Sequence, residues 1–324
     1  VYKNGSLKVG KYGERKIPTG VIESGKIKNL KKMEEILVLL KKEQKMKSAR
    51  VSLPEEQGYL FEFKLSKSGL EDIRESIELS LEEHIPLSAQ DAIFDFEILE
   101  EDEKFFTVQV SAISRNVIDD YLAVFRNSNM KVQSFELEAQ AISRAIIKKG
   151  DTDAYMIVDF GEKRTGIFIV SNGTVVFTST LDIGGSLLTN MIQKSFQISF
   201  EEAERMKKEH GLERNTTSKE LFSVLLNSIS ILRDEIMKHS VYWHTYKEGD
   251  KYHPPIKKII LCGGDSNLIG LPEYLSSSTK IPVEIADVWI NIINKNKYIP
   301  EITFENSLTY AAALGLALGD FEDK

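Results

Sequence analysis

Four short segments in the second half of the chain contain residue types that could do chemistry. Three of them combine glycines with carboxylates or hydroxyls, the residue types that hold phosphates and their metal ions, and the fourth pairs a glutamate with a lysine. The first runs from Asp159 through Gly161 to Thr165, directly after an apolar stretch. A strand that leads into such a turn can direct backbone N–H groups and the threonine hydroxyl at a phosphate. Asp159 is the candidate magnesium ligand, through water, because magnesium keeps several waters and takes few protein carboxylates. Taken alone, a β-hairpin with a polar turn explains this segment better.

Two glycine pairs supply places where the backbone can approach a ligand closely. Gly263 and Gly264 follow an apolar run, and Asp265 comes next. Backbone without side chains admits a flat ring or a phosphate. Gly184 and Gly185 open a predicted helix, and helix N-termini favour anions. A tight strand-to-helix loop and a plain helix cap are the competing interpretations.

The fourth segment is a predicted helix that carries an acid and a base on one face. Glu204 and Lys207 are three residues apart, so a helix places them side by side. Ser199 is the predicted N-cap of this helix, and Glu202 completes a capping box. The pair can bracket a ribose and an adenine, whereas an ion pair on the helix surface is the common alternative.

The elements that position these segments alternate between strands and helices. Apolar stretches bounded by turn residues predict strands at 51–53, 59–65, 92–99, 105–113, 130–135, 154–159, 165–170, 174–179, 257–262 and 282–286. Helical spacing predicts helices from the Asn29 cap to about Lys47, after a Ser68 cap, over 116–126, in much of 187–247 and over Ala311–Leu318. The pairs Asn4-Gly5 and Asn172-Gly173 are hairpin turn signals.

Length and composition bound the architecture. The chain has 324 residues, 42% of them hydrophobic, which is enough for at least two domains. The mixed block 51–135 predicts a small subdomain of its own. The one cysteine, Cys262, excludes an internal disulfide framework and fits a reducing compartment. The histidines show neither metal-ligand spacing nor a Ser-His-Asp order.

Charge and hydropathy argue against nucleic-acid and membrane-spanning classes. The formal net charge is −7, and an acidic chain repels nucleic acid unless it carries a local basic stripe. The clustered lysines at 31, 32, 41 and 42 have glutamates among them, which indicates a solvated helix face. No apolar run approaches the roughly 18 residues of a membrane span.

The order of the four segments resembles the ATPase core shared by actin, sugar kinases and heat-shock chaperones. In that superfamily, the segment 159–166 looks like the second phosphate loop and Gly263-Gly264 looks like the adenosine loop. The segment 136–141 and the helix Ala311–Leu318, with Ala313 and Gly315, look like the two connecting helices.

Within this superfamily, the chain resembles the PilM family of type IV pilus assembly proteins over nearly its whole length. Residues 18–27 are similar to a PilM segment that leads into the first helix, and residues 234–243 are similar to its long helix before the adenosine strand. The block 51–135 stands where PilM and its relative FtsA carry a relocated small subdomain.

The resemblance implies an α/β, actin-like (ribonuclease H-like) two-domain ATPase fold with an inserted FtsA/PilM-type small subdomain and a nucleotide cleft between the domains. Residues 1–50 and 136–153 are expected to form the first actin-like domain, 51–135 the inserted subdomain, and 154–324 the second actin-like domain with the adenosine loop. The implied cofactors are ATP and Mg. The implied nucleotide-binding residues are Asp159, Gly161, Thr165, Gly184, Gly185, Glu204, Lys207, Gly263, Gly264 and Asp265, and Glu138 is the candidate for orienting an attacking water.

Two departures from the family pattern affect these expectations. The first phosphate loop, an Asp-x-Gly turn near the family's N-terminus, is absent, so we expect the chain to lack an N-terminal strand and loop. Glu162 stands where strongly hydrolytic relatives place another glycine. A carboxylate there crowds a γ-phosphate, so any ATPase activity is expected to be weak.

The implied role is a nucleotide-loaded scaffold at the inner-membrane platform of type IV pilus assembly, or in the related type II secretion apparatus. The implied partner is the N-terminal cytoplasmic tail of PilN, a single-span inner-membrane protein, with other pilus assembly proteins as further partners. A groove in the block 51–135 or at its border with the first domain is the expected docking place. We expect no nucleic-acid partner, no direct membrane insertion, and a cytoplasmic location, peripheral at the inner membrane through the partner.

Two alternatives remain at this stage. An FtsA-like cell-division adaptor carries an amphipathic C-terminal helix for membrane attachment, whereas the tail 319–324 is short and acidic. A metabolic kinase of the same superfamily needs a catalytic base that faces a substrate pocket. The sequence offers no convincing base beyond Glu138 and Asp159.

Overall fold

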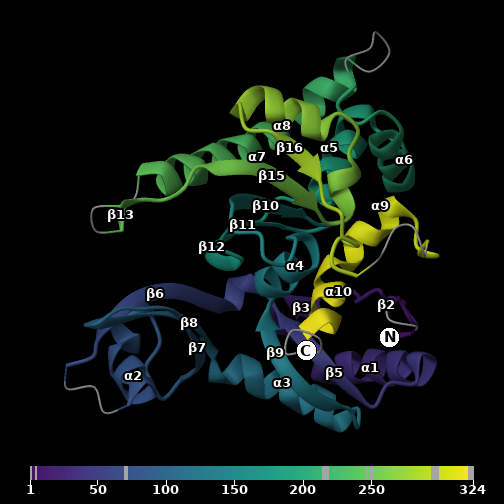
Figure 1. The fold of residues 1–324 in the computed structure, drawn as a ribbon. Helices are drawn as coiled ribbons and strands as arrows, with labels where there is room; N and C mark the ends of the chain where they lie inside the picture. Colours follow the sequence, from purple (N-terminus) through teal and green to yellow (C-terminus); the bar gives the residue numbers. More distant parts are fainter. Residues whose placement is uncertain are drawn as a thin grey trace. The chain divides into compact units, whose positions relative to one another are not determined.

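The computed structural model describes residues 2–3, 6–68, 72–213, 219–245, 247–248, 251–292 and 299–319 (Figure 1). The chain divides into two compact units, Val1–Glu138 and Ala139–Lys324. Each unit has its own hydrophobic core. Among the described helices, none has the length and apolar character that crossing a bilayer requires.

The second unit is built on a five-stranded sheet with the order β12-β11-β10-β15-β16. Its strands are β10 (Ala154–Phe160), β11 (Thr165–Ser171), β12 (Thr174–Leu181), β15 (Ile256–Cys262) and β16 (Val283–Ile285). β10 pairs antiparallel with β11 and parallel with β15. The predicted turn Asn172-Gly173 joins β11 to β12, and both residues have positive φ, 52° and 78°, as a type I′ hairpin requires.

Helices cover both faces of this sheet (Figure 1). One face packs against α5 (Gly185–Phe196), α6 (Phe200–His210), α7 (Lys219–Thr245) and α8 (Leu271–Thr279). Figure 1 shows α4 (Glu138–Ile146) and α10 (Ala311–Leu318) on the other side. Because both faces are covered, β10 is an almost continuous apolar run rather than an alternating one. The remaining short elements are β13 (Lys247–Glu248), β14 (Lys251–Tyr252), α9 (Phe304–Ser307) and the 3-10 turns η2 (Gly264–Asn267) and η3 (Leu308–Tyr310).

α4 and α10 touch backbone to backbone. A Cβ atom on Gly315 would overlap the carbonyl group of Ala141, so the helices approach this closely only because residue 315 is glycine. The Arg144 Nη1 atom donates a hydrogen bond to the Gly315 carbonyl at 3.1 Å. The structure therefore brings together Ala141 and Gly315, one from each of the two segments that the superfamily resemblance indicated. Ala313, by contrast, is exposed. The first of these helices, α4, begins at Glu138 rather than at residue 136, because residues 136–137 end β9.

The first unit contains a parallel strand pair, β5 (Ser48–Leu53) with β9 (Lys131–Leu137). The helices α1 (Leu30–Gln44) and α3 (Arg115–Asn127) pack with this pair in one apolar cluster. Two short hairpins precede α1: β1 (Tyr2–Lys3) with β2 (Ser6–Leu7), and β3 (Ile22–Glu23) with β4 (Lys26–Ile27). The turn predicted at Asn4-Gly5 lies outside the described residues.

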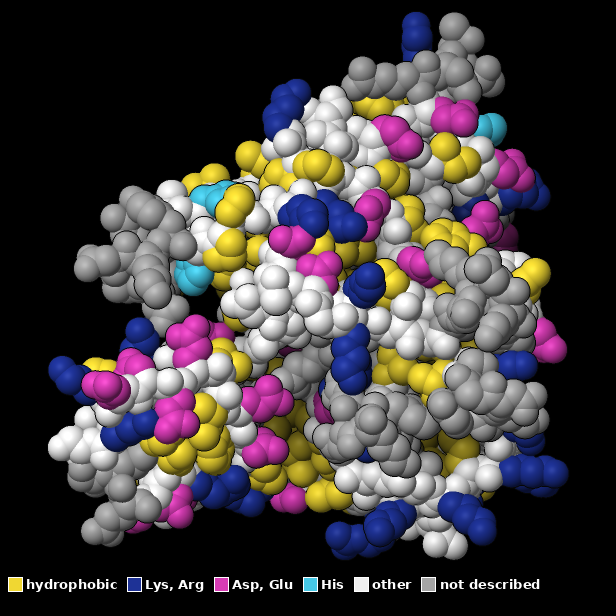
Figure 2. Space-filling view, in the orientation of Figure 1, with side chains coloured by type: hydrophobic (Ala, Val, Ile, Leu, Met, Phe, Trp, Pro, Cys, Tyr) yellow, Lys and Arg dark blue, Asp and Glu magenta, His cyan; other side chains and the backbone are white. Residues whose placement is uncertain are grey.

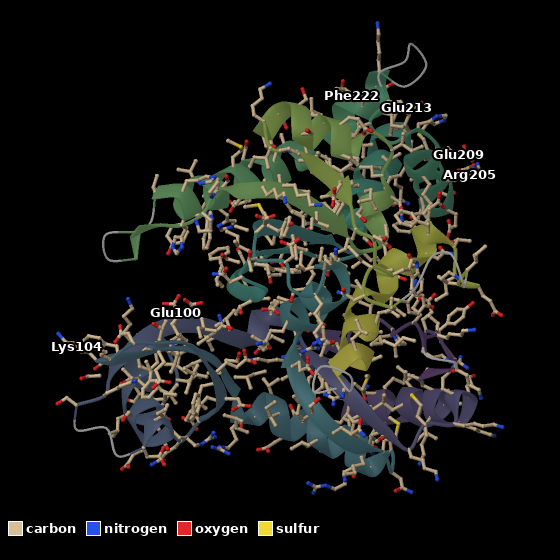
Figure 3. The ribbon with its side chains drawn as sticks, in the orientation of Figure 1. Glu100, Lys104, Arg205, Glu209, Glu213 and Phe222 are labelled. Carbon is tan, nitrogen blue, oxygen red and sulfur yellow. The ribbon has the colours of Figure 1, made fainter. Side chains whose placement is uncertain are left out.

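A separate three-stranded antiparallel sheet, β6-β8-β7, forms inside the predicted small subdomain. Its strands are β6 (Gly58–Ser66), β7 (Ala92–Glu101) and β8 (Phe105–Ser114), with the turn η1 (Glu55–Gln57) before β6. The helix α2 (Ile73–His84) covers one face, and its Ile77 and Leu81 are fully buried there. Figure 3 labels Glu100 and Lys104 beside the acidic turn that joins β7 to β8.

Two predicted helix boundaries differ from the structure. α2 is capped by Asp72, whose Oδ1 atom accepts hydrogen bonds from the N–H groups of Arg74 and Glu75. Ser68 is four residues too early for that role. α1 begins after its predicted Asn29 cap but ends at Gln44 rather than near Lys47, because Lys45 adopts a left-handed conformation. The assignment of 1–50 with 136–153, 51–135 and 154–324 to three domains stays a prediction.

Candidate functional site

The carboxyl ends of β10 and β15 bring two predicted segments together. Asp159 is the register partner of both Gly166 and Cys262, and Gly263 follows directly. Gly263 has a φ of 86°, and a Cβ atom there would lie 2.6 Å from Asp159 Oδ1 and 2.6 Å from the Phe160 carbonyl oxygen. Only glycine fits this position. Ligands of α/β sheets bind beyond the carboxyl ends of parallel strands, so this edge is the candidate site.

The turn 161–164 and the start of α5 hold one another. The N–H groups of Gly185 and Ser186 donate to carbonyls of the turn, at 3.0 Å and 2.8 Å. A Cβ atom on Gly184 would lie 2.5 Å from the turn's backbone. The glycine pair thus serves close packing, and two of the N–H groups expected to attract an anion already have protein partners. The Gly161 N–H also bonds within the turn, to the Arg164 carbonyl at 3.0 Å.

Thr165 occupies a different environment from the one predicted. Its side chain is fully buried, and its hydroxyl donates a hydrogen bond to the Ile183 carbonyl at 2.6 Å. The donor that was expected to face a phosphate instead fastens β11 to the loop before α5. Tertiary packing brings the Ile183 carbonyl next to Thr165 and so determines the direction of the hydroxyl. The sequence of the turn does not indicate this contact.

Lys207 is the centre of a buried polar network on α6. Its side chain is 3% exposed, and its ammonium donates to the Gly185 carbonyl at 3.1 Å and to Asp265 Oδ1 at 2.7 Å. The third partner is Glu204 Oε2, at 3.0 Å. An ammonium has three protons to donate, so all three are used. One lysine therefore ties α6 to the start of α5 and to the loop after β15.

Burial and charge act in opposite directions on the two carboxylates of this network. Burial raises the pKa of Asp265, and the nearby Lys207 ammonium only partly offsets it. Burial also disfavours the Glu204 carboxylate, but the hydrogen bond from Thr189 at 2.5 Å and the ammonium groups of Lys207 and Lys208 prevail and lower its pKa. Glu204 is therefore ionised at neutral pH, and it is the more exposed of the two, at 29% against 16%.

The capping box predicted for α6 is present, with Ser199 and Glu202 bonded reciprocally. It fixes the start of the helix and thereby the face that carries Glu204 and Lys207. Arg205 and Glu209 of the same helix are exposed (Figure 3), whereas Lys207 is buried.

The structure thus places all ten predicted nucleotide-binding residues in the segments that meet at this edge of the second unit. Gly264 lies in η2, where a Cβ atom would lie 3.1 Å from a methyl group of Thr309. Glu138 is the first residue of α4 and the last of the first unit, so its role stays a prediction. Thr189 was missed by sequence reasoning, because a threonine four residues after Gly185 is an ordinary helix residue.

No group of three or more His, Cys, Asp or Glu side chains is gathered as a metal ligand set in the part of the chain that the structure describes. A magnesium ion bound through Asp159 and water needs no such group. Asp159 offers an oxygen acceptor for the waters of a hydrated metal, and Glu204 offers one for the hydroxyls of a ribose. These two carboxylates therefore fit a nucleotide with its metal ion.

Comparison with known proteins gives a family match over nearly the whole chain. The family described as "Type IV pilus assembly protein PilM" matches residues 2–321. A solved PilM-PilN type IV pilus biogenesis complex is similar in structure, with a TM-score of 0.76 at 18% identity, covering 95% of this chain and 90% of that chain.

More distant similarities extend to other actin-like proteins. MreB5 of Spiroplasma citri bound to ADP has a TM-score of 0.57 at 14% identity, covering 97% of this chain and 80% of that one. The cell division protein FtsA of Neisseria meningitidis serogroup B is 24% identical over 171 residues, covering 48% of this chain. The match spans 41% of the length of this FtsA. The structural likenesses confirm the predicted α/β actin-like fold.

Proposed function

The chain belongs to the PilM family of type IV pilus assembly proteins, and from this premise we propose that it is a nucleotide-binding scaffold that is held at the inner membrane by a PilN-like protein. The observation that carries the assembly role is the family match over residues 2–321. The match to FtsA is shorter, and it is explained by the fold that the two families share.

The nucleotide part of the proposal rests on the edge where β10 and β15 end. Asp159 and the side-chain-free backbone at Gly263 meet there, and Glu204 adds an ionised, partly exposed carboxylate. We assign Asp159 to the water shell of a magnesium ion, Glu204 to a ribose hydroxyl, and Gly263-Gly264 to the face of the base. A bound ion would supply charge neutralisation for the phosphates.

The remaining predicted residues take a framing role in this proposal. Gly161, Thr165, Gly184 and Gly185 hold the turn and α5 in place, and Lys207 with Asp265 locks α6 against them. The MreB5 structure, which has the same fold, is described as bound to ADP, which supports nucleotide binding without fixing any contact here. Glu162 is an exposed residue of this turn, and we propose that turnover is slow.

Thermal unfolding with and without millimolar Mg-ATP tests the nucleotide assignment. Ligand at about 100 times its dissociation constant stabilises the folded state by about 2.7 kcal/mol, which raises the melting temperature measurably. An unchanged melting temperature in Mg-ATP and in Mg-ADP would overturn the nucleotide part.

The partner part of the proposal rests on the family and on the solved PilM-PilN complex. A short disordered tail can add to an exposed sheet edge or lie in a groove. In the small subdomain, β6 and β7 are the outer strands of the described three-stranded sheet, so each presents an edge. We therefore keep the block 51–135 and its border as the docking region.

Capture on an immobilised peptide with the sequence of the PilN N-terminal tail tests this part, with a scrambled peptide as control. We expect capture by the tail alone. Absence of capture would contradict the partner assignment. Equal capture by a folded variant that lacks the block 51–135 would move the docking region elsewhere.

A further inference from the structure

Basic charge is concentrated in the first 50 residues. They carry 14 Lys or Arg against 5 Asp or Glu, whereas the whole chain has a formal net charge of −7. The rest of the chain is therefore acidic, and the opposite signs belong to different parts of the molecule. In Figure 2, dark-blue Lys and Arg side chains line the lower right margin, where Figure 1 shows α1.

The outer face of α1 combines these charges with exposed apolar side chains. Ile36 and Leu37 are the buried residues of the helix. On the outer side, Val38 is 47% exposed and Leu39 is 48% exposed. Lys31 lies seven residues before Val38 and Lys42 four residues after it, so they share its face. Two large apolar side chains are thus flanked by lysines along a surface helix.

The acidic residues of α1 are each engaged by a neighbour. Glu34 accepts a hydrogen bond from Asn127 at 2.6 Å, and Glu35 pairs with Lys32 at 2.7 Å. Glu43 pairs with Arg15 of the preceding loop. Lys31, Lys42 and Lys45 are exposed and have no acidic partner within the described residues. The outer face is therefore basic in net terms, although the sequence alternates in sign.

The loop before β3 extends this face. The Arg15–Glu43 pair and a 3.4 Å hydrogen bond from Gln44 Nε2 to the Tyr12 carbonyl hold the loop against the end of α1. Tyr12 is 42% exposed, and the exposed Lys11 and Lys16 lie on the same loop. An aromatic ring between cationic side chains is typical of a surface that meets a membrane interface.

Further cations lie where α1 and α3 end. Lys131 at the start of β9 donates its N–H to the Lys47 carbonyl at 3.1 Å, so these two residues are adjacent. Lys45 and Lys47 directly follow α1, and Arg126 is in the last turn of α3. All four side chains are exposed.

We propose that the outer face of α1 and the adjoining loop 11–16 rest on the anionic phospholipid surface of a bilayer. On such a helix the lysines attract the anionic phospholipid head groups, and the apolar side chains between them fit the apolar boundary beneath the head groups. A duplex nucleic acid offers the charge but no apolar layer for Val38 and Leu39. The contact is peripheral, and it is independent of nucleotide and of the PilN tail.

Sedimentation with vesicles of phosphatidylcholine alone and of phosphatidylcholine with phosphatidylglycerol in a seven-to-three ratio tests the proposal. We expect binding only to the anionic vesicles, weakened by high salt. Each lysine near such a surface strengthens binding by roughly fivefold. The variant Lys31→Glu/Lys42→Glu/Lys45→Glu should therefore lose at least about 100-fold in affinity.

A matched control reverses three exposed lysines of the second unit, as Lys148→Glu/Lys194→Glu/Lys219→Glu. It has the same net charge as the α1 variant, and we expect much tighter vesicle binding than the α1 variant shows. An equal loss of vesicle affinity in both variants would overturn the assignment to α1, because the net charge of the protein would then explain the binding. Circular dichroism and melting temperature establish that both variants fold.

The apolar part of the contact has its own readout. Leu39→Trp should show a blue-shifted emission with the anionic vesicles and none with phosphatidylcholine alone. The two native tryptophans, Trp243 and Trp289, are buried in the second unit and give a constant background. An unshifted spectrum, or binding to duplex DNA without binding to vesicles, would overturn the proposal. A failed Mg-ATP or PilN-tail experiment leaves the vesicle result unaffected, so the two proposals fail separately.

Discussion

Replacing Lys207 with methionine should destabilise the second unit strongly. Methionine has a similar length and no charge, so packing is nearly kept while three hydrogen bonds are lost. Removing one partner of a buried ion pair costs about 3–5 kcal/mol, because the other charge is left buried. Asp265 would be that charge, at 16% exposure. We expect the lower end of the range, about 3 kcal/mol, because Glu204 keeps the Lys208 partner at 3.2 Å.

The chain offers a specific probe for this measurement. Both of its tryptophans, Trp243 and Trp289, lie buried in the second unit. Tryptophan fluorescence in urea therefore follows the unfolding of that unit, and the midpoint shift gives the change in stability. Lys208→Met is the matched control. Lys208 pairs with Glu204 too but is 72% exposed, so its replacement should cost less than about 1 kcal/mol.

The loss of stability that Lys207→Met causes should be larger at neutral pH than at acidic pH. Burial raises the folded-state pKa of Asp265 above its ordinary value of 3.8, so the folded protein holds this proton more tightly than the unfolded chain. Loss of the ammonium raises that pKa further. Stability of the variant therefore recovers as pH falls through the raised pKa, and the deficit is largest at neutral pH.

A double variant separates charge from packing. Lys207→Met/Asp265→Asn removes the stranded carboxylate, so we expect part of the loss to be recovered. Two results would refute the assignment of Lys207 as a buried, fully engaged cation. One is a free energy of unfolding of Lys207→Met within about 1 kcal/mol of the wild-type value. The other is a loss of stability that grows as the pH becomes more acidic.

Three further predictions concern packing and binding. Gly315→Ala should cost about 1–3 kcal/mol, because its Cβ atom would overlap the backbone of α4, whereas Ala313→Ser on the exposed side of α10 should be near neutral; urea unfolding that gives the same midpoint for both would contradict the contact. Thr165→Val should cost about 1–3 kcal/mol by the same assay, since it leaves a buried carbonyl without its donor, and a neutral result would indicate that water replaces the hydroxyl. By calorimetry, Asp159→Ala should weaken nucleotide binding only when magnesium is present, and Glu204→Gln should weaken it with or without magnesium; wild-type affinity in both would defeat the site assignment.

The sequence predicted the parts of the site whose cause is local. The apolar run before Asp159 and the Asn172-Gly173 turn each specify a strand or a hairpin from a few adjacent residues, and the structure has both. A glycine pair directly after a buried strand predicted a close approach of the backbone at Gly263. Its positive φ and the short distance from its Cβ position to Asp159 agree with that close approach, and its role in nucleotide binding stays a prediction.

The parts that sequence reasoning missed depend on residues far apart in the chain. Helical spacing places Lys207 beside Glu204, but burial of the lysine requires Asp265, 58 positions away. Gly185 was expected to favour an anion because it opens a helix. In the structure its missing side chain makes room for the Asp265 carboxylate. Such contacts arise from tertiary packing, which a pattern read along one chain does not contain.

The single cysteine allows the opening of the proposed site to be followed as a rate, in addition to its affinity for a ligand. Cys262 is fully buried at the end of β15, with its thiol 3.7 Å from Asp159 Oδ1. A soluble disulfide reagent can reach this thiol only when the strand end opens, so the labelling rate reports the free energy of that opening. A ligand that binds the closed form slows labelling in proportion to its occupancy. One chemical modification, followed by a colour change, thus gives both the local stability of the loop and the affinity of whatever binds beside it.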